Sequence, residues 1–472
     1  MHTRRLALDI APWVLFRALA RKDQPFLIDA GQPWGNEWVS SMGFGPRMQF
    51  RIAAGDPEAD SPLAALDAVL APLAPTAREQ AQQRPVPFAG GAVIGLAYET
   101  KNAVERLPQT QVEAPNAPRL ACAIYDAVVA YDHRHRDYLV ASWHLSDQAL
   151  ARYAEEVLDA VAEARWTAEG EDGATVAPAR QISLASNFDG DGYERCVERI
   201  RAYIAAGDVY QVNLSLRLSS PLPCAALDLY GHLRAVQPVP FGAYFDLGSE
   251  HVLSNSPELF LRRRGERVET CPIKGTRRRG TTDAEDARLA AELRTDPKER
   301  AEHVMIVDLE RNDLGRVCRT GSVRVPRLAD LASFRTIHHL VSTVTGSVPS
   351  AVTAGDLLSA TFPGGSITGA PKIRAMEIID EVERGPRGFY TGALGWIDAS
   401  GDLDLNVAIR TAIAAEGTLS YHAGSGIVAD SRPECEYAES LVKADVFFRA
   451  LGLPVQPPAA AGREAAHRRA LA

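Results

Sequence analysis

The sequence predicts a protein of the mixed α+β class, because strand-like and helix-like patterns occupy separate stretches of the chain. Residues 25–29 and 48–52 are short apolar runs bounded by turn residues, a pattern typical of strands. Residues 60–73 carry apolar side chains at helical spacing, which indicates an amphipathic helix. The 472 residues are enough for one large domain or for about two to three of ordinary size.

Composition and charge narrow the class of protein. A hydrophobic share of 46% and a charged share of 24% are ordinary for a soluble enzyme. The net charge of -9 argues against a nucleic-acid partner, because such binding needs a basic face. The six cysteines are scattered without a C-x-x-C pair, which disfavours zinc and disulfide frameworks and suits a reducing compartment. Since no signal peptide or membrane-spanning stretch is evident, we expect a cytoplasmic protein without a membrane partner.

The remaining local signals divide the chain into regions. Residues 87–99 are glycine-rich and apolar, and they are interpreted as a tightly packed strand because they lack a phosphate-loop signature. Residues 146–165 predict a helix, and residues 167–180 have the composition of a linker. A further helix begins near residues 189–192 and is expected to end at Gly207. We therefore predict an N-terminal region (1–180), a second region (187–453) and a flexible tail (454–472).

A basic segment at residues 269–280 is the first candidate for chemistry. Pro272 and Gly275 predict a sharp turn, and Lys274 lies between them. A lysine held on such a turn becomes a nucleophile when desolvation or neighbouring cations lower its pKa, since only the neutral amine attacks. The alternative is a solvated basic turn, which is the commoner role of such charge runs.

Two predicted helices each carry a pair of glutamates on one face. In the first, Asp296 is a suitable N-cap with Glu299 as its capping-box partner, and Glu299 and Glu302 share a face. In the second, Ser431 is the expected cap.

The second helix places Glu436, Glu439 and Lys443 on one face. Carboxylates from two helices suit Mg²⁺, a hard cation that leaves coordination positions for water and an anionic substrate. Solvated helix faces are the alternative interpretation of either pair alone.

Anion-binding features complete this half of the chain. Gly424 and Gly426 predict a glycine turn whose backbone N–H groups face a carboxylate, and residues 362–374 predict a loop that opens a helix. Arg410 lies inside a strand-like run, and a buried arginine needs a partner or an anionic ligand. Together the residues predict a Mg²⁺-assisted enzyme that acts on a small carboxylate.

Four segments resemble the chorismate-utilising enzymes. They read Pro-Ile-Lys-Gly-Thr-Arg-Arg-Arg-Gly at 272–280, Glu-His-Val-Met-Ile-Val-Asp-Leu-Glu-Arg-Asn-Asp-Leu at 302–314, Phe-Pro-Gly-Gly-Ser-Ile-Thr-Gly-Ala-Pro-Lys at 362–372, and Gly-Ser-Gly-Ile-Val-Ala-Asp-Ser at 424–431. The resemblance runs in consecutive order through the second region. It implies chorismate as the substrate, Mg²⁺ as the cofactor, and a fold of two large antiparallel β-sheets packed as a sandwich with helices around the outside.

The resemblance also implies roles for residues at matching positions. It makes Glu258 the general acid and His339 a histidine beside the leaving group. On its own Glu258 is equally compatible with a strand-end glutamate, and a histidine in such a segment is more often packed in the core. Glu302 and Glu439 are implied as Mg²⁺ ligands, with Glu299 and Glu436 ligating or holding water. The implied substrate-binding residues are Thr276, Tyr390, Arg410, Gly424, Gly426 and Lys443.

Position 274 selects among the family's reactions. Members with lysine there typically form 4-amino-4-deoxychorismate, a precursor of p-aminobenzoate and folate, whereas the anthranilate-forming members usually have alanine. Formation of anthranilate is therefore the alternative, and isochorismate or salicylate formation is a more distant one. No glutaminase segment is recognisable in the sequence, so the resemblance implies a separate glutamine amidotransferase subunit that supplies ammonia. A non-catalytic subunit would be expected to lack Lys274 or the carboxylates, and all are present.

Overall fold

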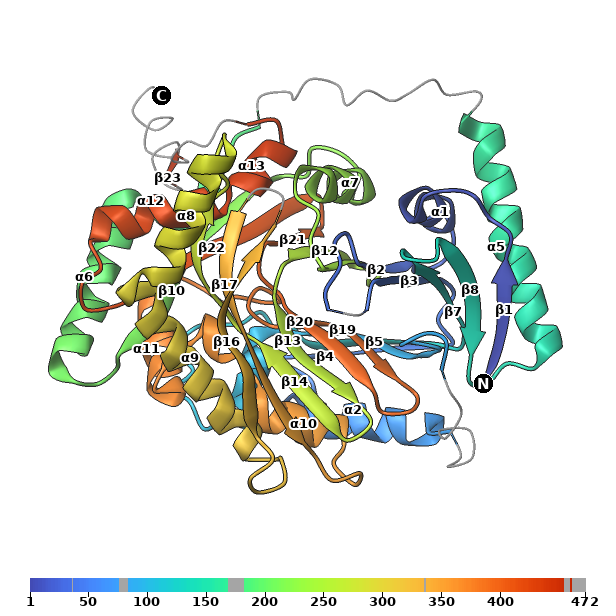
Figure 1. Ribbon diagram of the computed structural model, residues 1–472, viewed down its shortest axis with the longest axis horizontal. Helices are drawn as coiled ribbons and strands as arrows, with labels where there is room; N and C mark the ends of the chain where they lie inside the picture. The colour runs from blue at the N-terminus through green and yellow to red at the C-terminus, as the bar shows by residue number, and fades with distance from the viewer. Residues whose placement is uncertain (36, 76–83, 169–181, 335–336, 454–458, 461–472) are drawn as a thin grey trace.

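Two large β-sheets carry the fold of the computed structural model (Figure 1). The structure describes residues 1–35, 37–75, 84–168, 182–334, 337–453 and 459–460. Within these residues the sheets have 13 and 10 strands, and the strands pair antiparallel except for one short parallel pair, β9 with β23. The predicted α+β class and the two antiparallel sheets are confirmed.

The larger sheet contains strands from both ends of the chain. In spatial order it consists of β1 (His2–Leu6), β8 (Asp137–Ser142), β7 (Val128–Asp132), β3 (Val39–Gly43), β2 (Phe26–Asp29), β11 (Phe241–Asp246), β12 (Glu250–Ser256), β21 (Thr411–Ala415), β22 (Thr418–Ile427), β10 (Gln211–Pro221), β9 (Ala185–Ser186) and β23 (Ala459–Ala460), with β18 (Gly369–Ala370) paired to β10.

The smaller sheet also contains strands from distant parts of the chain. Its order is β15 (Ile273–Arg278), β17 (Ile337–Ser347), β14 (Arg267–Cys271), β13 (Leu259–Arg264), β20 (Leu403–Val407), β19 (Ala393–Asp398), β5 (Gly91–Leu96), β6 (Pro118–Tyr125) and β4 (Met48–Ala53), with β16 (Arg324–Ser333) paired to β17. The predicted regions 1–180 and 187–453 therefore contribute strands to both sheets, and each sheet joins the two regions.

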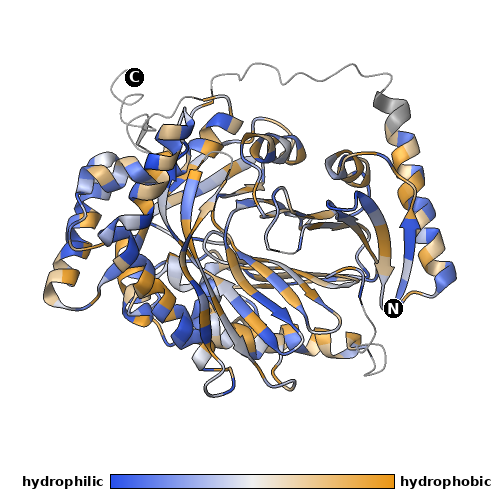
Figure 2. Cartoon of the chain, in the orientation of Figure 1, coloured by the Kyte–Doolittle hydropathy of each residue, from blue (hydrophilic) through white to orange (hydrophobic). Residues whose placement is uncertain are grey.

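Helices surround the sheets, and Figure 2 shows hydrophilic stretches alternating with hydrophobic ones along them, as expected for helices that bury one face. They are α1 (Pro12–Leu19), α2 (Pro62–Leu70), α4 (Lys101–Val104), α5 (Asp147–Ala168), α6 (Gly190–Ala206), α7 (Ala226–Val236), α8 (Asp283–Thr295), α9 (Pro297–Gly315), α10 (Ala354–Thr361), α11 (Lys372–Val382), α12 (Pro433–Lys443) and α13 (Asp445–Ala450), with short 3₁₀ turns η1 (Pro57–Asp60), η2 (Ala71–Leu73), η3 (Tyr98–Thr100) and η4 (Gly365–Ile367).

Aromatic side chains fill the space between the two sheets. Phe26 and Phe245 come from the larger sheet, and Val93 and Trp396 from the smaller one, yet all four belong to one buried cluster. Phe88 joins them, because its ring lies 6.1 Å from the Phe26 ring and stacks on the Trp396 ring at 5.0 Å. The sheets thus pack face to face as a sandwich, which confirms the predicted architecture.

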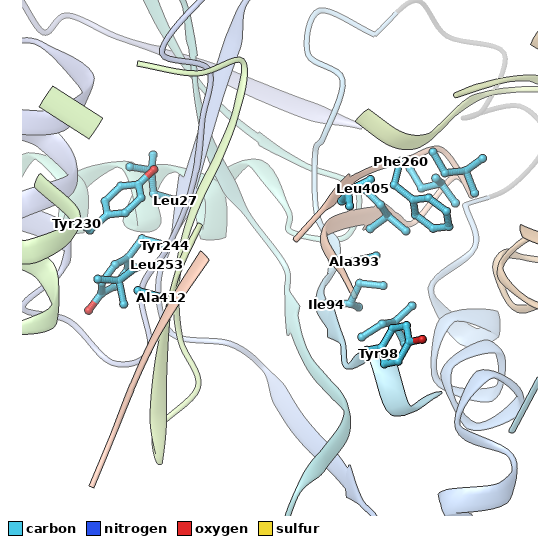
Figure 3. Packing of buried hydrophobic residues seen from close by; sticks show 14 of the residues in the cluster. Leu27, Ile94, Tyr98, Tyr230, Tyr244, Leu253, Phe260, Ala393, Leu405 and Ala412 are labelled. Atoms are coloured by element: carbon cyan, nitrogen blue, oxygen red, sulfur yellow. The ribbon is translucent and has the colours of Figure 1, made fainter. Parts of the chain in front are cut away.

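The outer faces of the sheets are also buried. Figure 3 shows Tyr244 and Leu253 of the larger sheet packed with Tyr230 of α7, while Ile94 and Leu405 of the smaller sheet lie in a second group. Apolar side chains on both faces of a sheet require cover on both sides, which the partner sheet and the helices provide.

Local signals placed several helices correctly. The Asp189 side chain caps α6 by accepting a hydrogen bond from the Gly192 N–H at 2.8 Å, and Gly207 ends that helix with φ +86°. Asp296 caps α9 by accepting from the backbone N–H groups of Lys298 and Glu299 at 3.0 and 3.2 Å. The predicted capping-box role of Glu299 is wrong, because its carboxylate accepts from the Arg277 side chain instead.

The predicted helix at residues 146–165 is confirmed as α5, and the predicted strand at 87–99 as the buried strand β5. Residues 169–180 of the predicted linker lie outside the described residues, and residues 167–168 belong to α5. The predicted tail also lies outside them, except for residues 459–460 in β23. Among the helices that the structure describes, none combines the length and the apolar character needed to cross a membrane.

Candidate active site

The segment that carries Lys274 forms an edge of the smaller sheet. The predicted turn there is wrong, because Lys274 lies within β15, where it pairs with Leu340 of β17. Gly275 interrupts the register as a β-bulge and has φ +68°, a conformation that favours glycine. The bulge bends the strand, and Lys274 Nζ donates a hydrogen bond to the Ser366 carbonyl oxygen at 3.2 Å.

The surroundings of Lys274 favour the neutral amine. The side chain is half-buried, and removal from water lowers its pKa, with the positive charge of Lys443 acting in the same direction. Glu302, Glu258 and Glu439 oppose this effect, and the net pKa is below that of an ordinary lysine. The charges that act on the amine thus come from both predicted glutamate helices and from the predicted general acid.

Glu258 lies between β12 and β13 with its side chain buried. Its Oε1 accepts the Ile273 backbone N–H at 3.4 Å, which places the carboxyl next to the residue that precedes Lys274. Burial raises the pKa of Glu258 to about 7, although the nearby Ser366 hydroxyl and Lys274 act in the opposite direction. A carboxyl group with this pKa is protonated in about half of the molecules at neutral pH and is suited to acid catalysis.

One ring nitrogen of His339 is buried and has no hydrogen-bond partner among the described residues. Its Nδ1 lies 3.0 Å from the Gly275 carbonyl oxygen, which only accepts, so Nδ1 carries the proton. The Nε2 atom is buried and lacks a hydrogen-bond partner among the described residues. Burial, followed by the charge of Arg410, lowers the pKa of His339 to about 3, so the ring is neutral and Nε2 is an acceptor. Thr276 lies beside it, with Oγ1 3.1 Å from Nδ1.

Arg410 is placed differently from the prediction. It lies between β20 and β21 with φ +51°, so the expected strand is interrupted at this residue. Its Nη1 atom is buried and has no hydrogen-bond partner within the part of the chain that the structure describes. Burial lowers the pKa of Arg410, while Tyr421 and Glu258 counteract that effect. A guanidinium with an unused buried donor is a candidate binding group for an anionic ligand.

The glycines at 424 and 426 lie in a strand. The predicted turn is wrong, because both belong to β22, where Gly424 pairs with Ser215 and Gly426 with Asn213 of β10. A Cβ atom on Gly424 would lie 2.3 Å from a backbone oxygen of β10, and one on Gly426 would lie 2.7 Å from the Gln211 side chain. Their absent side chains therefore permit close strand packing, and Tyr390 stacks on His422 of the same strand at 4.9 Å.

The four predicted metal ligands lie on α9 and α12. Glu302 is half-buried and burial raises its pKa, while the Glu439 carboxylate forms an ion pair with Lys443 at 2.8 Å. Ser431 is not the cap of α12, because its hydroxyl donates to Glu436 Oε1 at 2.6 Å and Arg432 occupies the cap position. Within the described residues, no three His, Cys, Asp or Glu side chains are grouped at a spacing that would hold a metal ion.

Two polar residues of the site, Ser366 and Gln211, were not predicted from the sequence. Ser366 receives hydrogen bonds at its carbonyl oxygen from Lys274 and from the Asn213 amide, and its buried hydroxyl acts on the Glu258 carboxyl. Gln211 contacts Asn213 at 3.3 Å, and its Oε1 is buried and has no partner among the described residues. Only strand pairing and the packing of η4 bring these residues to Lys274.

Several buried polar atoms of the site residues have no hydrogen-bond partner within the described structure. They are Arg410 Nη1, His339 Nε2, Gln211 Oε1 and Glu436 Oε2. A folded protein leaves few such atoms, so each of them is a candidate contact for a polar ligand.

Comparison with known proteins identifies the class. A family model described as chorismate binding enzyme matches residues 23–449, and the chain belongs to this family of chorismate-utilising enzymes. Aminodeoxychorismate synthase component 1 of Bacillus subtilis is 42% identical over 78% of each chain. Anthranilate synthase component 1 of Thermus thermophilus is 40% identical over 90% of this chain and 92% of its own.

Solved structures agree with the fold. Anthranilate synthase component I from Streptococcus pneumoniae superposes with a TM-score of 0.75 at 30% sequence identity, over 88% of this chain and 93% of its own. The menaquinone-specific isochorismate synthase of Escherichia coli, with a TM-score of 0.68 at 18% identity over 95% and 94% of the two chains, shares the fold.

Proposed function

We propose that this protein replaces the C4 hydroxyl of chorismate by an amino group and forms 4-amino-4-deoxychorismate. The observation that carries the proposal is Lys274, an amine with a lowered pKa that donates to the Ser366 carbonyl oxygen and interacts with the charge of Glu258. The relatives include both aminodeoxychorismate synthases and anthranilate synthases at comparable identity. The presence of lysine at position 274 favours amination at C4.

The residues allow a balanced two-step exchange. The neutral Lys274 amine forms a bond to C2 of the ring while the C4–O bond breaks, and Glu258 gives its proton to the departing hydroxyl, which leaves as water. The adduct nitrogen returns a proton to the Glu258 carboxylate. Ammonia then bonds to C4 as the C2–N bond breaks, Glu258 protonates the leaving lysine, and the new ammonium group at C4 returns a proton to the Glu258 carboxylate. The net reaction consumes chorismate and ammonia and yields the amino product and water.

Substrate binding is assigned to the unpartnered groups. In this proposal Arg410 Nη1 and Lys443 face carboxylate oxygens, the backbone at Gly424 and Gly426 lies beside the ligand, and His339 Nε2 accepts from a substrate hydroxyl. Tyr390 and Thr276 form part of the wall. Each assignment satisfies a group that the protein alone leaves without a partner or partly exposed.

Substitution of Arg410 by methionine is expected to raise KM for chorismate by about 10- to 100-fold, because a charge-assisted hydrogen bond to a substrate carboxylate is lost. The measurement is steady-state kinetics with ammonium as the nitrogen donor. The control is Arg201→Met, which removes an arginine whose side chain pairs with Glu198 on the exposed face of α6. An unchanged KM for Arg410→Met would remove Arg410 from the binding site.

The carboxylates of α9 and α12 are the ones proposed to hold Mg²⁺, and in the described residues they are not drawn together at the spacing of metal ligands. Glu436 Oε2 is buried without a partner among the described residues, and burial raises the pKa of Glu302 even though the charges of Lys274 and Lys298 act against that rise. We propose that Glu302, Glu436 and Glu439 hold the ion, with Glu299 beside them. When bound, Mg²⁺ supplies positive charge for a chorismate carboxylate.

Chelation of divalent cations is expected to abolish turnover, and Glu436→Gln is expected to raise the Mg²⁺ concentration required by about tenfold or more. Calorimetric titration of Mg²⁺ provides a readout that does not depend on catalysis. Glu434→Gln is the matched control, because Glu434 is exposed on the same helix. Equal Mg²⁺ affinity in Glu436→Gln and in the control would exclude Glu436 as a ligand.

The ammonia is proposed to come from a separate glutamine amidotransferase subunit, which is consistent with the name component 1 of the relatives. The test of the proposed function is the product that the purified chain forms from chorismate, Mg²⁺ and ammonium, identified by chromatography and mass spectrometry. We expect 4-amino-4-deoxychorismate. Anthranilate as the product would overturn the proposal and assign the chain to the competing reaction.

A further inference from the structure

The buried face of α9 carries a carboxyl group that the proposed reaction does not use. This helix packs against β15, β16 and β17 of the smaller sheet (Figure 1), and its buried side chains are apolar except for His303, Glu310 and Asp313. Glu310 is 6% exposed, at a position where an apolar side chain is the usual choice. A buried carboxyl group costs free energy unless it is paired or protonated, so the partners of Glu310 decide its state.

Glu310 lacks the cation that its neighbour Asp313 has. Asp313 forms an ion pair with Lys372 Nζ at 2.6 Å, and the other two hydrogen bonds of that ammonium group go to backbone oxygens. Within the described residues Glu310 forms no ion pair, and its side chain makes one hydrogen bond, which the Thr270 hydroxyl donates to Oε2 at 2.9 Å. A buried carboxyl group in these surroundings favours the protonated form.

Strand pairing brings Glu310 toward Glu258, the proposed general acid. Its hydrogen-bond donor Thr270 is followed in β14 by Cys271, and Cys271 pairs with Leu259 of β13. Leu259 is the residue directly after Glu258. The hydrogen bond from Thr270 thus holds Glu310 near the start of β13, on the side of the strand where Glu258 precedes it.

The η4 turn approaches the same two carboxyl groups. A Cβ atom on Gly365 would lie 3.5 Å from Glu310 Cγ, so the turn packs directly on the Glu310 side chain. The next residue, Ser366, has the hydroxyl that acts on the Glu258 carboxyl. One short turn therefore joins the surroundings of the general acid to those of Glu310.

The charges around Glu310 keep it protonated. Burial and then the charge of Glu258 raise the pKa of Glu310 well above its ordinary value, and Asp313 acts in the same direction. The hydrogen bond from Thr270 and the charge of Lys372 oppose this rise without cancelling it. Two carboxyl groups that repel in this way ionise one at a time, and their protons belong to the pair. In the free chain Glu258 ionises near neutral pH, whereas Glu310 keeps its proton.

An anionic substrate changes the balance between the two carboxyl groups. In the free chain the positive charges of Lys274 and Arg410 lower the pKa of Glu258. The negative charge of chorismate counteracts these cations, so it raises the proton affinity of Glu258, which faces the substrate in the proposed reaction, more than that of Glu310 behind it. The proton of Glu310 is then the nearest one available to the general acid.

We propose that Glu310 is a positioning residue that supplies a proton to Glu258 when chorismate binds. The O–H bond of the Glu310 carboxyl breaks and an O–H bond forms on the Glu258 carboxylate, so the general acid is loaded without a proton from water. The proton returns to Glu310 when the product leaves. The inference rests on the proposed role of Glu258 as the acid, and its test does not use the identity of the product.

The test counts the protons taken up when chorismate binds, by calorimetric titration in buffers of different ionisation enthalpy between pH 7 and pH 9. Lys274→Ala in excess Mg²⁺ and without ammonium is the parent chain, so that binding is measured without the covalent step. We expect the parent to take up less than about 0.3 proton per chorismate, because Glu310 supplies the proton. With Glu310→Gln added, uptake is expected to rise toward about one proton as pH passes the pKa of Glu258.

Two further variants make the result specific. Asp308→Asn is the matched control, because Asp308 lies on the exposed face of the same helix, and its proton uptake is expected to equal that of the parent. Thr270→Val removes the hydrogen bond that eases the ionisation of Glu310, so this variant is expected to take up protons from water as Glu310→Gln does. A role of Glu310 in packing alone would change stability and chorismate affinity but not the proton count.

Uptake of about one proton by the parent chain would overturn the proposal, and this measurement does not require Glu310→Gln to fold. Equal uptake by the parent and by Glu310→Gln would contradict it as well. Both results would leave the proposed function in place if the chain still forms 4-amino-4-deoxychorismate. Anthranilate in the product assay would refute the proposed function without changing the proton count, so the two failures are distinguishable.

Discussion

Replacing Lys274 by alanine is expected to reduce formation of 4-amino-4-deoxychorismate by roughly 10³-fold or more, because the group that bonds to C2 is lost. Chorismate is still expected to bind, since the proposed contact with Arg410 and the proposed Mg²⁺ ligands on α9 and α12 remain. The product and the rate are measured by chromatography and mass spectrometry. Lys298→Ala is the matched control, because Lys298 also lies near Glu302 but is half exposed, with an ion pair to Asp430 at 3.3 Å.

The covalent step has its own signature. When ammonium is withheld, the wild-type chain incubated with chorismate and Mg²⁺ is expected to gain mass after denaturation, corresponding to chorismate minus water attached at Lys274. The alanine variant is expected to show no such gain. Full amination activity in Lys274→Ala, or an adduct on another residue, would show that the lysine is not the nucleophile.

Replacing Glu258 by glutamine is expected to lower kcat by about 10²- to 10⁴-fold, because the general acid for the departing hydroxyl is removed while the shape of the pocket is kept. KM for chorismate should change little. A loss confined to KM would instead indicate a role in binding. Glu250→Gln is a suitable control, since Glu250 is another buried glutamate of this sheet, paired with Arg51 away from Lys274.

The pH profile follows from the two pKa shifts. Glu258 must be protonated to act as an acid, and its pKa is about 7, so activity is expected to fall as pH rises above neutrality. Lys274 must be neutral, so activity rises with pH up to its lowered pKa. Because the two groups interact, the two apparent pKa values of the resulting bell-shaped profile describe the pair and not either residue alone. In Glu258→Gln the alkaline limb is expected to disappear from the residual activity.

The same shift affects stability. A carboxyl group whose pKa is raised by folding stabilises the protein at low pH, and this contribution is lost as pH rises through the folded-state pKa near 7. The free energy of unfolding of Glu258→Gln should therefore decline less between pH 6 and pH 8 than that of the wild type. A group selected for stability alone would not be buried in this way, whereas a general acid requires it.

Features encoded by neighbouring residues were predictable from the sequence. The helix start near residues 189–192, the cap at Asp296 and the stop at Gly207 depend on contacts within a single turn, and the structure confirms each of them. The two-sheet sandwich was expected from the family resemblance, because strand order depends on pairings between distant segments that local patterns do not encode.

Features that depend on distant partners were mispredicted or missed. Gly275 and Gly424 were interpreted as turn residues, yet one forms a bulge against β17 and the other makes room for a neighbouring strand. Arg410 was expected within a strand and instead occupies a left-handed position between two. Ser366 and Gln211 were not predicted, since their place beside Lys274 arises only when η4 and β10 pack together.

The interleaving of the two sheets has a consequence for how the chain is made. Strand β2 pairs Ile28 with Ala243, and β5 pairs Ile94 with Gly395, so N-terminal strands wait for partners synthesised much later. Until those partners leave the ribosome, apolar strand edges stay open, and such species are prone to aggregate. Pairings this distant along the sequence also slow folding. We therefore expect chaperones to bind the nascent chain. The lysine pocket is completed only after nearly the whole polypeptide has emerged.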